Sequence, residues 1–320
     1  VAISVLAGAK ALLPEYADPR AGQLDLVSVT LSLAAILPTV YAVKHASAHG
    51  VDASTAILLA FGAVTGVMFV RRQRRLTSPL LDVFLFTDRT FSAALVVLLI
   101  GLAGVGGTMY LVTQYLQFVE GLTPFTAGLW MGPPALAMLA AAIGAPLIAR
   151  RVRPGLIMGT TLALSVIGYA LLATAGTGDA VAVAAGFAFV YLGLGAIAAL
   201  GTDMVVGAAP AAKSGSASAM SETVQELGIA VGVALLGSLT TALYSGLSPE
   251  DAESITGSPS TAERAPGEFV QAAQEAFTTG INIASAVAGG AIVAATVLCL
   301  VALRHVRPLG EDQDVAADPR

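Results

Sequence analysis

Two glutamates inside an apolar stretch are the residues whose type and spacing best support chemistry. Glu222 and Glu226 stand four apart within the segment 217–244, so in a helix they share one face. A charge in the middle of a bilayer costs about 2.5–3.5 kcal/mol, and such a group is expected to face a water-filled cavity. Because two neighbouring desolvated carboxylates repel each other, at least one should hold a proton and release it when a cation arrives. This pattern favours proton-for-cation exchange.

The depth of these acids in a membrane decides between two interpretations. If the helix enters hydrocarbon at Ala217, Glu226 lies about 14 Å deep, near the midplane. If the helix enters at Thr223, both glutamates are solvated at the membrane rim and need no functional explanation. Asp203 lies near the end of another apolar segment and is the third candidate for proton or substrate coupling.

Other polar residues within apolar segments are weaker candidates for the wall of a cavity. They are Gln114, Gln117, Tyr169, Tyr191 and Asn282. For each of them, a hydrogen bond to a neighbouring helix is the competing explanation.

The sequence lacks the motifs that would indicate an enzyme, a metal site or a nucleic-acid-binding protein. It contains no H-E-x-x-H, G-x-S-x-G or Walker pattern. His45 and His49 are four apart, but no further ligand type lies near them in sequence, so we expect neither a metal nor a cofactor. No basic stripe is interleaved with aromatic residues, which argues against nucleic acid as a partner.

Eight apolar segments are long enough to carry the candidate residues across a bilayer. Each has roughly 18 residues or more, enough to span about 30 Å of hydrocarbon. The chain is 56% hydrophobic and 12% charged, whereas soluble domains carry about 25% charged residues. The sequence therefore predicts an all-α, polytopic membrane protein. The segments are 26–43, 53–70, 91–113, 124–148, 155–174, 180–204, 217–244 and 277–303.

Basic residues predict the direction of these crossings. Fourteen of the sixteen Lys and Arg residues fall in alternate connecting segments, and the other connections hold only Lys44 and Arg264. Since basic loops stay in the cytoplasm during insertion, the C-terminus should be cytoplasmic and the acidic loop 245–276 should lie outside. Residues 266–277, within and just beyond that loop, read as a short amphipathic helix on the outer surface. The main topological anchors are Arg71, Arg72, Arg74, Arg75, Arg150, Arg151 and Arg153.

Four strings in the sequence carry a family resemblance. They are LLPEYADPRAGQLDLVSVTLS (12–32), SPLLDVFLFTDRTFSAAL (78–95), YLQFVEGLTPFTAGLWMGPPAL (115–136) and GSASAMSETVQELGIAVGVALLGS (215–238). With these strings the chain resembles the 14-helix drug:proton antiporter branch of the major facilitator superfamily, over essentially its whole length.

The resemblance implies a partial major facilitator fold with two linker helices and a six-helix C-terminal bundle. The bundle should consist of two inverted three-helix repeats that meet at about residue 175. Helices 1–5 of the family would be missing, and a complete transporter would need them. The implied parts are 1–13 (end of helix 6), 14–25 (cytoplasmic loop), 26–70 (two linker helices), 71–90 (basic cytoplasmic loop), 91–304 (transport bundle) and 305–320 (cytoplasmic tail).

The same resemblance implies a secondary active transporter of the plasma membrane. Its activity would be proton-coupled efflux of drugs or other lipophilic small molecules, cations above all, by alternating access. Glu222 and Glu226 match acidic positions that similar exporters use for cations, whereas Met138 stands where some relatives carry an aspartate. Its partners would be a small-molecule substrate, protons and the lipid bilayer. Export of an endogenous metabolite or antibiotic, and a non-functional truncated fragment of such a transporter, remain as alternatives.

Overall fold

A computed structural model describes residues 25–49, 52–76, 79, 81–210, 213–244 and 267–308. The segment expected to end helix 6 (1–13), nearly all of the loop 14–25, most of the acidic loop and most of the tail lie outside the described residues.

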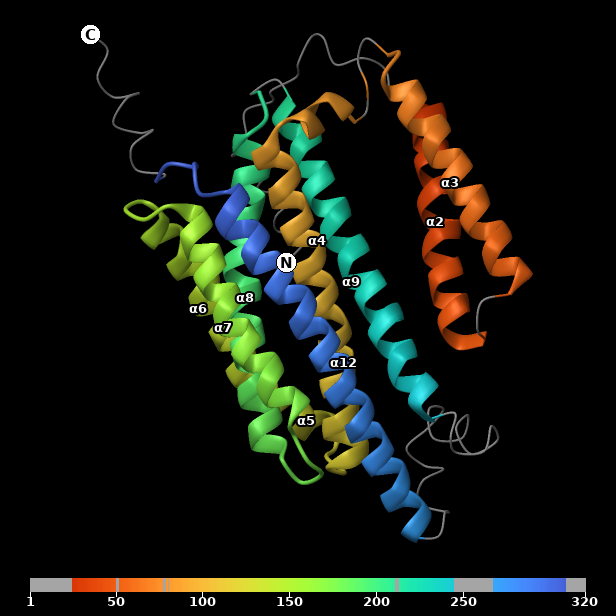
Figure 1. Cartoon of the computed structure of the whole chain (residues 1–320), viewed down its shortest axis with the longest axis vertical. Coiled ribbons are helices and arrows are strands. Elements are labelled where there is room, and N and C mark those ends of the chain that lie inside the picture. Colours follow the sequence, from red (N-terminus) through yellow and green to blue (C-terminus); the bar gives the residue numbers. More distant parts are fainter. Residues whose placement is uncertain are drawn as a thin grey trace, which may run out of the picture.

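The described chain is helical, with no strand in any of those ranges. Figure 1 shows a bundle formed by α4 to α12, with the α2–α3 hairpin standing beside α9. The elements are α2 (Leu26–His49), α3 (Ala53–Gln73), the 3-10 turn η1 (Val83–Thr87), α4 (Arg89–Gln114), the π-helical turn η2 (Tyr115–Val119), α5 (Pro124–Trp130), α6 (Gly132–Ala149), α7 (Pro154–Ala173), α8 (Ala180–Gly207), α9 (Ser214–Tyr244) and α12 (Gly267–Ala302).

These helices confirm the prediction of an all-α polytopic membrane protein. Within the described ranges, seven stretches are long and apolar enough to cross a membrane. The eighth expected crossing, 26–43, falls on α2, whose apolar part Leu26–Ala42 is shorter. Every apolar segment found in the sequence therefore lies on a helix.

The surface helix expected at residues 266–277 is not separate. Residues from Gly267 onwards form the first turns of α12, which continues without interruption to Ala302. The acidic loop expected at 245–276 therefore ends before Gly267. The sequence EFVQAAQEAF contains no proline or glycine, so nothing in it stops a helix that continues into the apolar run.

The crossing expected at 124–148 is divided in two near its N-terminal end. α5 ends at Trp130, Met131 N-caps α6, and Pro133 occupies one of the first two positions of the new helix. Proline is tolerated there because those amides have no intrahelical acceptor. Pro146 lies inside α6 without ending it.

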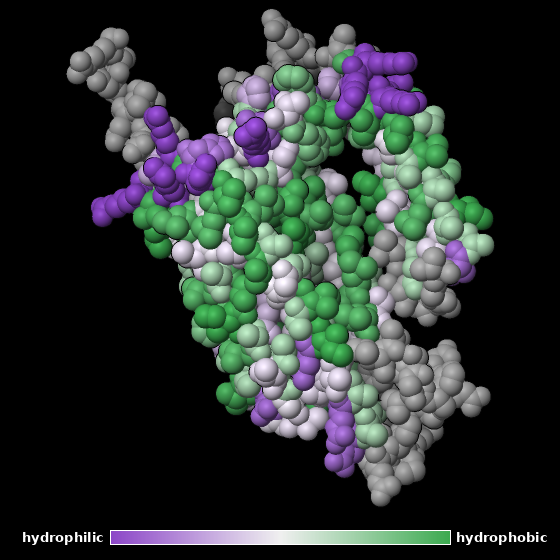
Figure 2. Space-filling view, in the orientation of Figure 1, coloured by the Kyte–Doolittle hydropathy of each residue, from purple (hydrophilic) through white to green (hydrophobic). Residues whose placement is uncertain are grey.

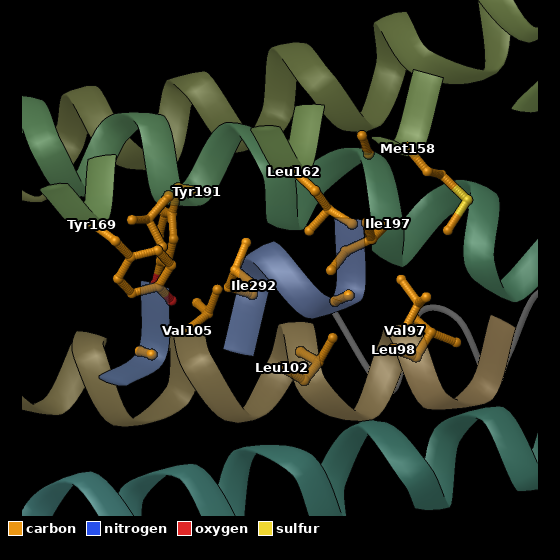
Figure 3. Close-up of a cluster of buried hydrophobic side chains, with 14 of the residues drawn as sticks. Val97, Leu98, Leu102, Val105, Met158, Leu162, Tyr169, Tyr191, Ile197 and Ile292 are labelled. Carbon is orange, nitrogen blue, oxygen red and sulfur yellow. The ribbon is translucent and has the colours of Figure 1, made fainter. Parts of the chain in front are cut away.

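Helix pairing in the bundle follows the two halves expected of the repeats. α4, the first helix of one half, packs along α9, the second of the other half; α8 packs in the same way along α6. The third helices, α7 and α12, pack against each other. Side chains from α4, α7, α8 and α12 meet in the core, among them Leu98, Leu162, Ile197 and Ile292 (Figure 3).

The α4–α9 contact depends on glycines. A Cβ atom at Gly232 would overlap the carbonyl oxygen of Ala103, and one at Gly107 would overlap the carbonyl oxygen of Gly232. The two backbones can approach this closely only because neither glycine has a side chain. α9 is thereby held at a fixed distance from the core.

Most of the basic residues that the structure describes gather at one end of the molecule, which we call the basic end. Arg71 and Arg72 lie in the last turn of α3, Arg150 C-caps α6 and Arg153 N-caps α7. The Arg153 guanidinium also donates to the Arg304 carbonyl oxygen (Nη1–O 3.3 Å). In Figure 2 hydrophilic side chains cluster at this end, above a largely hydrophobic belt. The topological anchors predicted from the sequence therefore lie at one end of the helices.

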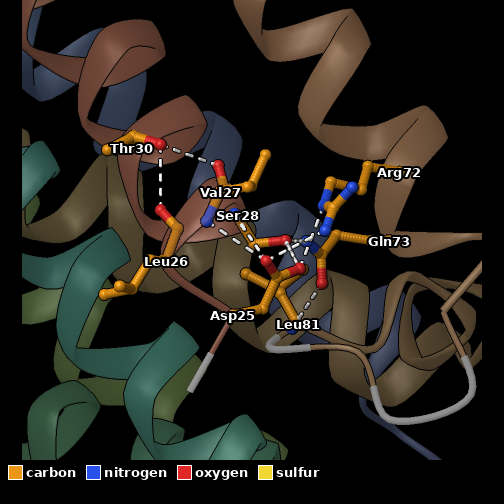
Figure 4. A network of polar contacts seen from close by, with 8 residues as sticks. All are labelled: Asp25, Leu26, Val27, Ser28, Thr30, Arg72, Gln73 and Leu81. Carbon is orange, nitrogen blue, oxygen red and sulfur yellow. Dashed lines mark hydrogen bonds and ion pairs between the residues drawn. The ribbon is translucent and has the colours of Figure 1, made fainter. Parts of the chain in front are cut away.

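A polar network at the basic end joins α2 to α3 (Figure 4). The Arg72 guanidinium donates to both carboxylate oxygens of Asp25 (2.9 and 3.0 Å) and holds the pKa of that carboxyl well below its usual range. The buried Gln73 side chain donates to Ser28 Oγ (2.7 Å) and accepts from the Leu81 amide (3.1 Å). Gln73 thus ties both helices to the segment that leads to α4.

Replacing Gln73 by leucine is expected to destabilise this junction by about 1–2 kcal/mol, because the Leu81 amide loses its acceptor in a buried place. Limited trypsin digestion at Arg74 and Arg75, with thermal unfolding in detergent, measures the change. Gln271→Leu is the matched control, since that glutamine is exposed and its side chain donates to Glu275 of its own helix. Equal effects of the two substitutions would contradict the role of Gln73.

Candidate functional site

The acids expected to do chemistry lie on α9 and on the end of α8. Glu226 is one residue from the middle of the apolar span Ser214–Thr240, and Glu222 is four residues nearer to the basic end. At 1.5 Å per residue, Glu226 lies about 18 Å from the start of α9. Asp203 lies four residues before the end of α8, close to the basic end. The glutamate at 226 therefore occupies mid-span.

Both glutamates lie off the face by which α9 joins the bundle. Gly228 and Gly232 of α9 pack against the α4 backbone at Leu99 and Ala103. Glu226 precedes Gly228 by two residues, which places it about 160° around the helix axis. Glu222 and Glu226 are both exposed. The acids thus project from the surface of the bundle and not into its core.

A small polar cluster connects α8 and α9 beside these acids. Gln225 Nε2 donates to Ser221 Oγ (3.2 Å) and to Thr202 Oγ1 (3.4 Å), and the two hydroxyls are 3.3 Å apart. Ser221 is fully buried. Thr202, Ser221 and Gln225 directly precede Asp203, Glu222 and Glu226 in sequence, so the cluster joins the helix segments that carry the three acids.

Thr202 and Ser221 were not among the residues singled out in the sequence. The sequence did contain a feature that could have identified them, since each directly precedes an acid within an apolar segment. Isolated hydroxyls in membrane helices commonly bond to their own backbone, and sequence alone does not show that these two meet. The cluster fixes how α9 is rotated relative to α8, and so which way Glu222 and Glu226 point.

Neither Glu222 nor Glu226 forms an ion pair with any residue that the structure describes. The described ranges also hold no group of three His, Cys, Asp or Glu residues that could bind a metal. A mid-span carboxyl without a basic partner is stable when protonated, when hydrated or when facing a cation. Such a group can exchange a proton for a cationic ligand.

Comparison with known families agrees with the helix pattern. A sequence model described as Major Facilitator Superfamily matches residues 6–233, which include α2 to α8 and most of α9. The chain belongs to this superfamily.

Several curated relatives are similar to this superfamily member. "Multidrug efflux pump LfrA" of Mycolicibacterium smegmatis is 37% identical over 310 residues, which cover 92% of this chain and 62% of the relative. "Methyl viologen resistance protein SmvA" of Salmonella typhimurium is 32% identical, covering 73% and 48%. "Probable actinorhodin transporter" of Streptomyces coelicolor is 30% identical, covering 75% and 43%. The chain thus spans about two fifths to three fifths of the length of these relatives.

Three of the polar residues predicted to line a cavity lie in the interior or between helices. Tyr191 stacks on Phe187 and donates to Met109 Sδ (3.1 Å). Asn282 donates to the Ala175 carbonyl oxygen (3.2 Å). The Tyr169 hydroxyl lies near the Thr108 hydroxyl, but the two form no hydrogen bond. The Thr108 hydroxyl donates instead to the Gly104 carbonyl oxygen of its own helix. A contact with a neighbouring helix accounts for the Tyr191 hydroxyl, whereas Asn282 bonds to the connection between α7 and α8 through its amide nitrogen, and its Oδ1 atom is buried without a partner among the described residues.

The two predicted glutamines lie near the C-terminal end of α4, opposite the basic end. Gln117 is half-buried and donates to the Thr113 carbonyl oxygen of its own turn (3.3 Å), and Gln114 is half-buried at the end of α4. The structure does not bring either glutamine to the acids of α9, which lie toward the basic end. Their place in a cavity wall stays a prediction.

Proposed function

We propose that this chain belongs to a secondary active transporter that exports drugs or other lipophilic small molecules, cations above all, in exchange for protons. The observation that carries the proposal is the exposed carboxyl of Glu226 at mid-span, one helical turn from Glu222. A protonated carboxyl is tolerated in this position, and an arriving cation replaces the proton as its electrostatic partner.

In this mechanism six helices form one half of an alternating-access transporter: α4, α6, α7, α8, α9 and α12. The short helix α5 extends α6. The acid-bearing face of α9 would border a central cavity that a second bundle completes. Asp203 would attract protons or cations at the basic end before they reach Glu222 and Glu226. α2 and α3 would be the linker helices of the 14-helix branch, and the basic end with the C-terminus would face the cytoplasm.

The names of the relatives support efflux as the direction of transport. One relative is a multidrug efflux pump and another confers resistance to methyl viologen, as their names state. Methyl viologen is a dication, which fits a site built on carboxylates. Met138, which replaces an aspartate found in some exporters, favours a narrower range of cations for this chain.

Export of an antibiotic is the second candidate. The names of two relatives state antibiotic transport: the probable actinorhodin transporter, and a tetracenomycin C resistance and export protein of Streptomyces glaucescens that is 27% identical over 322 residues. Neither name implies a cationic substrate. The charge of the exported compound therefore separates the two candidates.

Transport in everted membrane vesicles tests the proposal. A pH gradient with an acidic lumen is imposed on the vesicles. Vesicles that contain the full-length transporter should then accumulate ethidium or methyl viologen several-fold above empty vesicles. A protonophore should abolish the accumulation, because coupling to protons is the driving force. Accumulation of a neutral or anionic antibiotic alone would favour the second candidate, and accumulation that survives the protonophore would contradict proton exchange.

A further inference from the structure

A groove with a volume of about 450 Å³ lies between α2 and α3 at the basic end. Its deeper wall is apolar: Val27 and Leu31 come from successive turns of α2, and Met68 comes from α3. Val27 and Met68 are each about half exposed, at 51% and 53%. The groove therefore offers hydrocarbon contacts that no described helix covers.

Arginines line the end of the same groove. Met68, Arg71, Arg72 and Arg75 all border it, and their spacing of three, four and seven residues places them along one side of α3 and its final turn. A positively charged rim thus lies directly above an apolar wall. Figure 2 shows the change from hydrophilic to hydrophobic surface at this end of the molecule.

The arginines of the rim differ in their partners. Arg72 is held by the two-pronged ion pair with Asp25, which neutralises it and fixes the end of α3 against α2 (Figure 4). Arg71 and Arg75 are exposed, and neither pairs with a carboxylate among the residues that the structure describes. No carboxylate among the described residues thus neutralises these two guanidinium groups, in contrast to Arg72.

We propose that this groove binds the headgroup and upper acyl chains of an anionic phospholipid. Arg71 and Arg75 bind the phosphate, since guanidinium groups match phosphate oxygens in charge and geometry. Val27, Leu31 and Met68 contact the acyl chains. A free phosphate ion would gain nothing from the apolar wall, which makes the lipid the better occupant. Basic pockets between membrane helices on the cytoplasmic side suit such headgroups, and this is the side predicted for the basic end.

Native mass spectrometry of the purified full-length transporter with bound lipid tests the proposal. The protein is equilibrated with phosphatidylglycerol and phosphatidylcholine of identical acyl chains, and retention of each lipid is compared. Relative retention of phosphatidylglycerol should fall about fivefold in R75Q and about 25-fold in R71Q/R75Q. R71K/R75K, which keeps both charges, should retain most of it. The control is R150Q/R151Q, which removes two exposed arginines at the same end that do not line this groove.

Each other outcome overturns the proposal. Equal losses in R71Q/R75Q and R150Q/R151Q would mean general attraction to a basic surface. Unchanged retention in R75Q, which alters a residue beyond the end of α3 and leaves the helix intact, would mean that the groove holds no lipid and is covered by another part of the protein. Displacement of phosphatidylglycerol by millimolar inorganic phosphate would identify the ligand as a free anion. Export assays on the same variants test the proposed function separately from lipid binding, since none of these arginines adjoins the acids of α9.

Discussion

Replacing Glu226 by glutamine is expected to lower proton-driven export of a cationic dye at least tenfold. Glutamine has nearly the same size and keeps a polar group at mid-span, but it can neither release a proton nor pair with a cation. Glu226 lies one residue from the middle of the α9 span and is exposed, whereas Glu222, the other carboxyl on this face, lies one turn nearer to the basic end. The initial rate of dye accumulation in everted vesicles under an imposed proton gradient measures the effect.

Two further variants show whether the loss belongs to this position. Glu222→Gln should reduce export less, because that carboxyl lies one turn nearer to the basic end, where water is closer. Glu275→Gln removes an exposed carboxyl at the start of α12 and should leave the rate unchanged. Undiminished gradient-driven export by Glu226→Gln would remove this residue from the mechanism.

Cysteine accessibility separates a cavity position from a lipid-facing one. With Cys299 replaced by serine, Glu226→Cys should react with a membrane-impermeant maleimide from at least one side of the membrane, and a transported dye should slow that reaction. Cys299 of α12 is fully buried, and its thiol donates to the Gly155 carbonyl oxygen of α7. Because this bond does not involve α9, the replacement should disturb the acids little. A position 226 that reacts from neither side would place Glu226 against lipid, which contradicts the proposed site.

The helices could be predicted from the sequence because the membrane imposes a simple rule. A chain that crosses hydrocarbon must satisfy its backbone hydrogen bonds internally, so long apolar runs become helices. The runs 155–174 and 180–204 accordingly coincide with α7 and α8 to within a few residues. The arginines at the ends of α3 and α6 were also found in advance, because charge is excluded from the spans.

The differences arise where apolar length gives no information. The helix expected at 266–277 is continuous with the last crossing, because the polar sequence before the apolar run also favours a helix and hydropathy does not show where one helix ends and another begins. α6 begins after Met131 because prolines act on the backbone and not on hydropathy.

The contacts of the candidate site could not be predicted from the sequence, for a different reason. The bonds among Thr202, Ser221 and Gln225 join two helices whose relative rotation depends on the whole bundle. The spacing of Glu222 and Glu226 predicts that they share a face, but only the packing of Gly228 against α4 shows that this face is the exposed one. Local spacing is thus readable from sequence, whereas the partner of each face is not.

Replacing Gly232 by valine is expected to destabilise the bundle by about 3 kcal/mol or more, because the added atoms meet backbone and not a side chain that can rotate away. The Cβ atom alone would overlap the Ala103 carbonyl oxygen, so α9 must separate from α4 to admit it. That movement also breaks the contact of Gly107 with the Gly232 carbonyl. Thermal unfolding in detergent, followed by the monodisperse fraction on size-exclusion chromatography, measures the loss.

Gly290→Val provides the matched control, because a Cβ atom at Gly290 of α12 meets no atom within 4 Å. It carries the same change in helix propensity, which amounts to a few tenths of a kcal/mol, and its melting temperature should stay close to that of the parent. Gly232→Val should therefore lose both stability and export, since the α9 face that carries Glu226 is positioned by the α4 contact. Equal melting of the two variants would show that α9 is not held by close backbone packing, and the orientation of the acids would then need another cause.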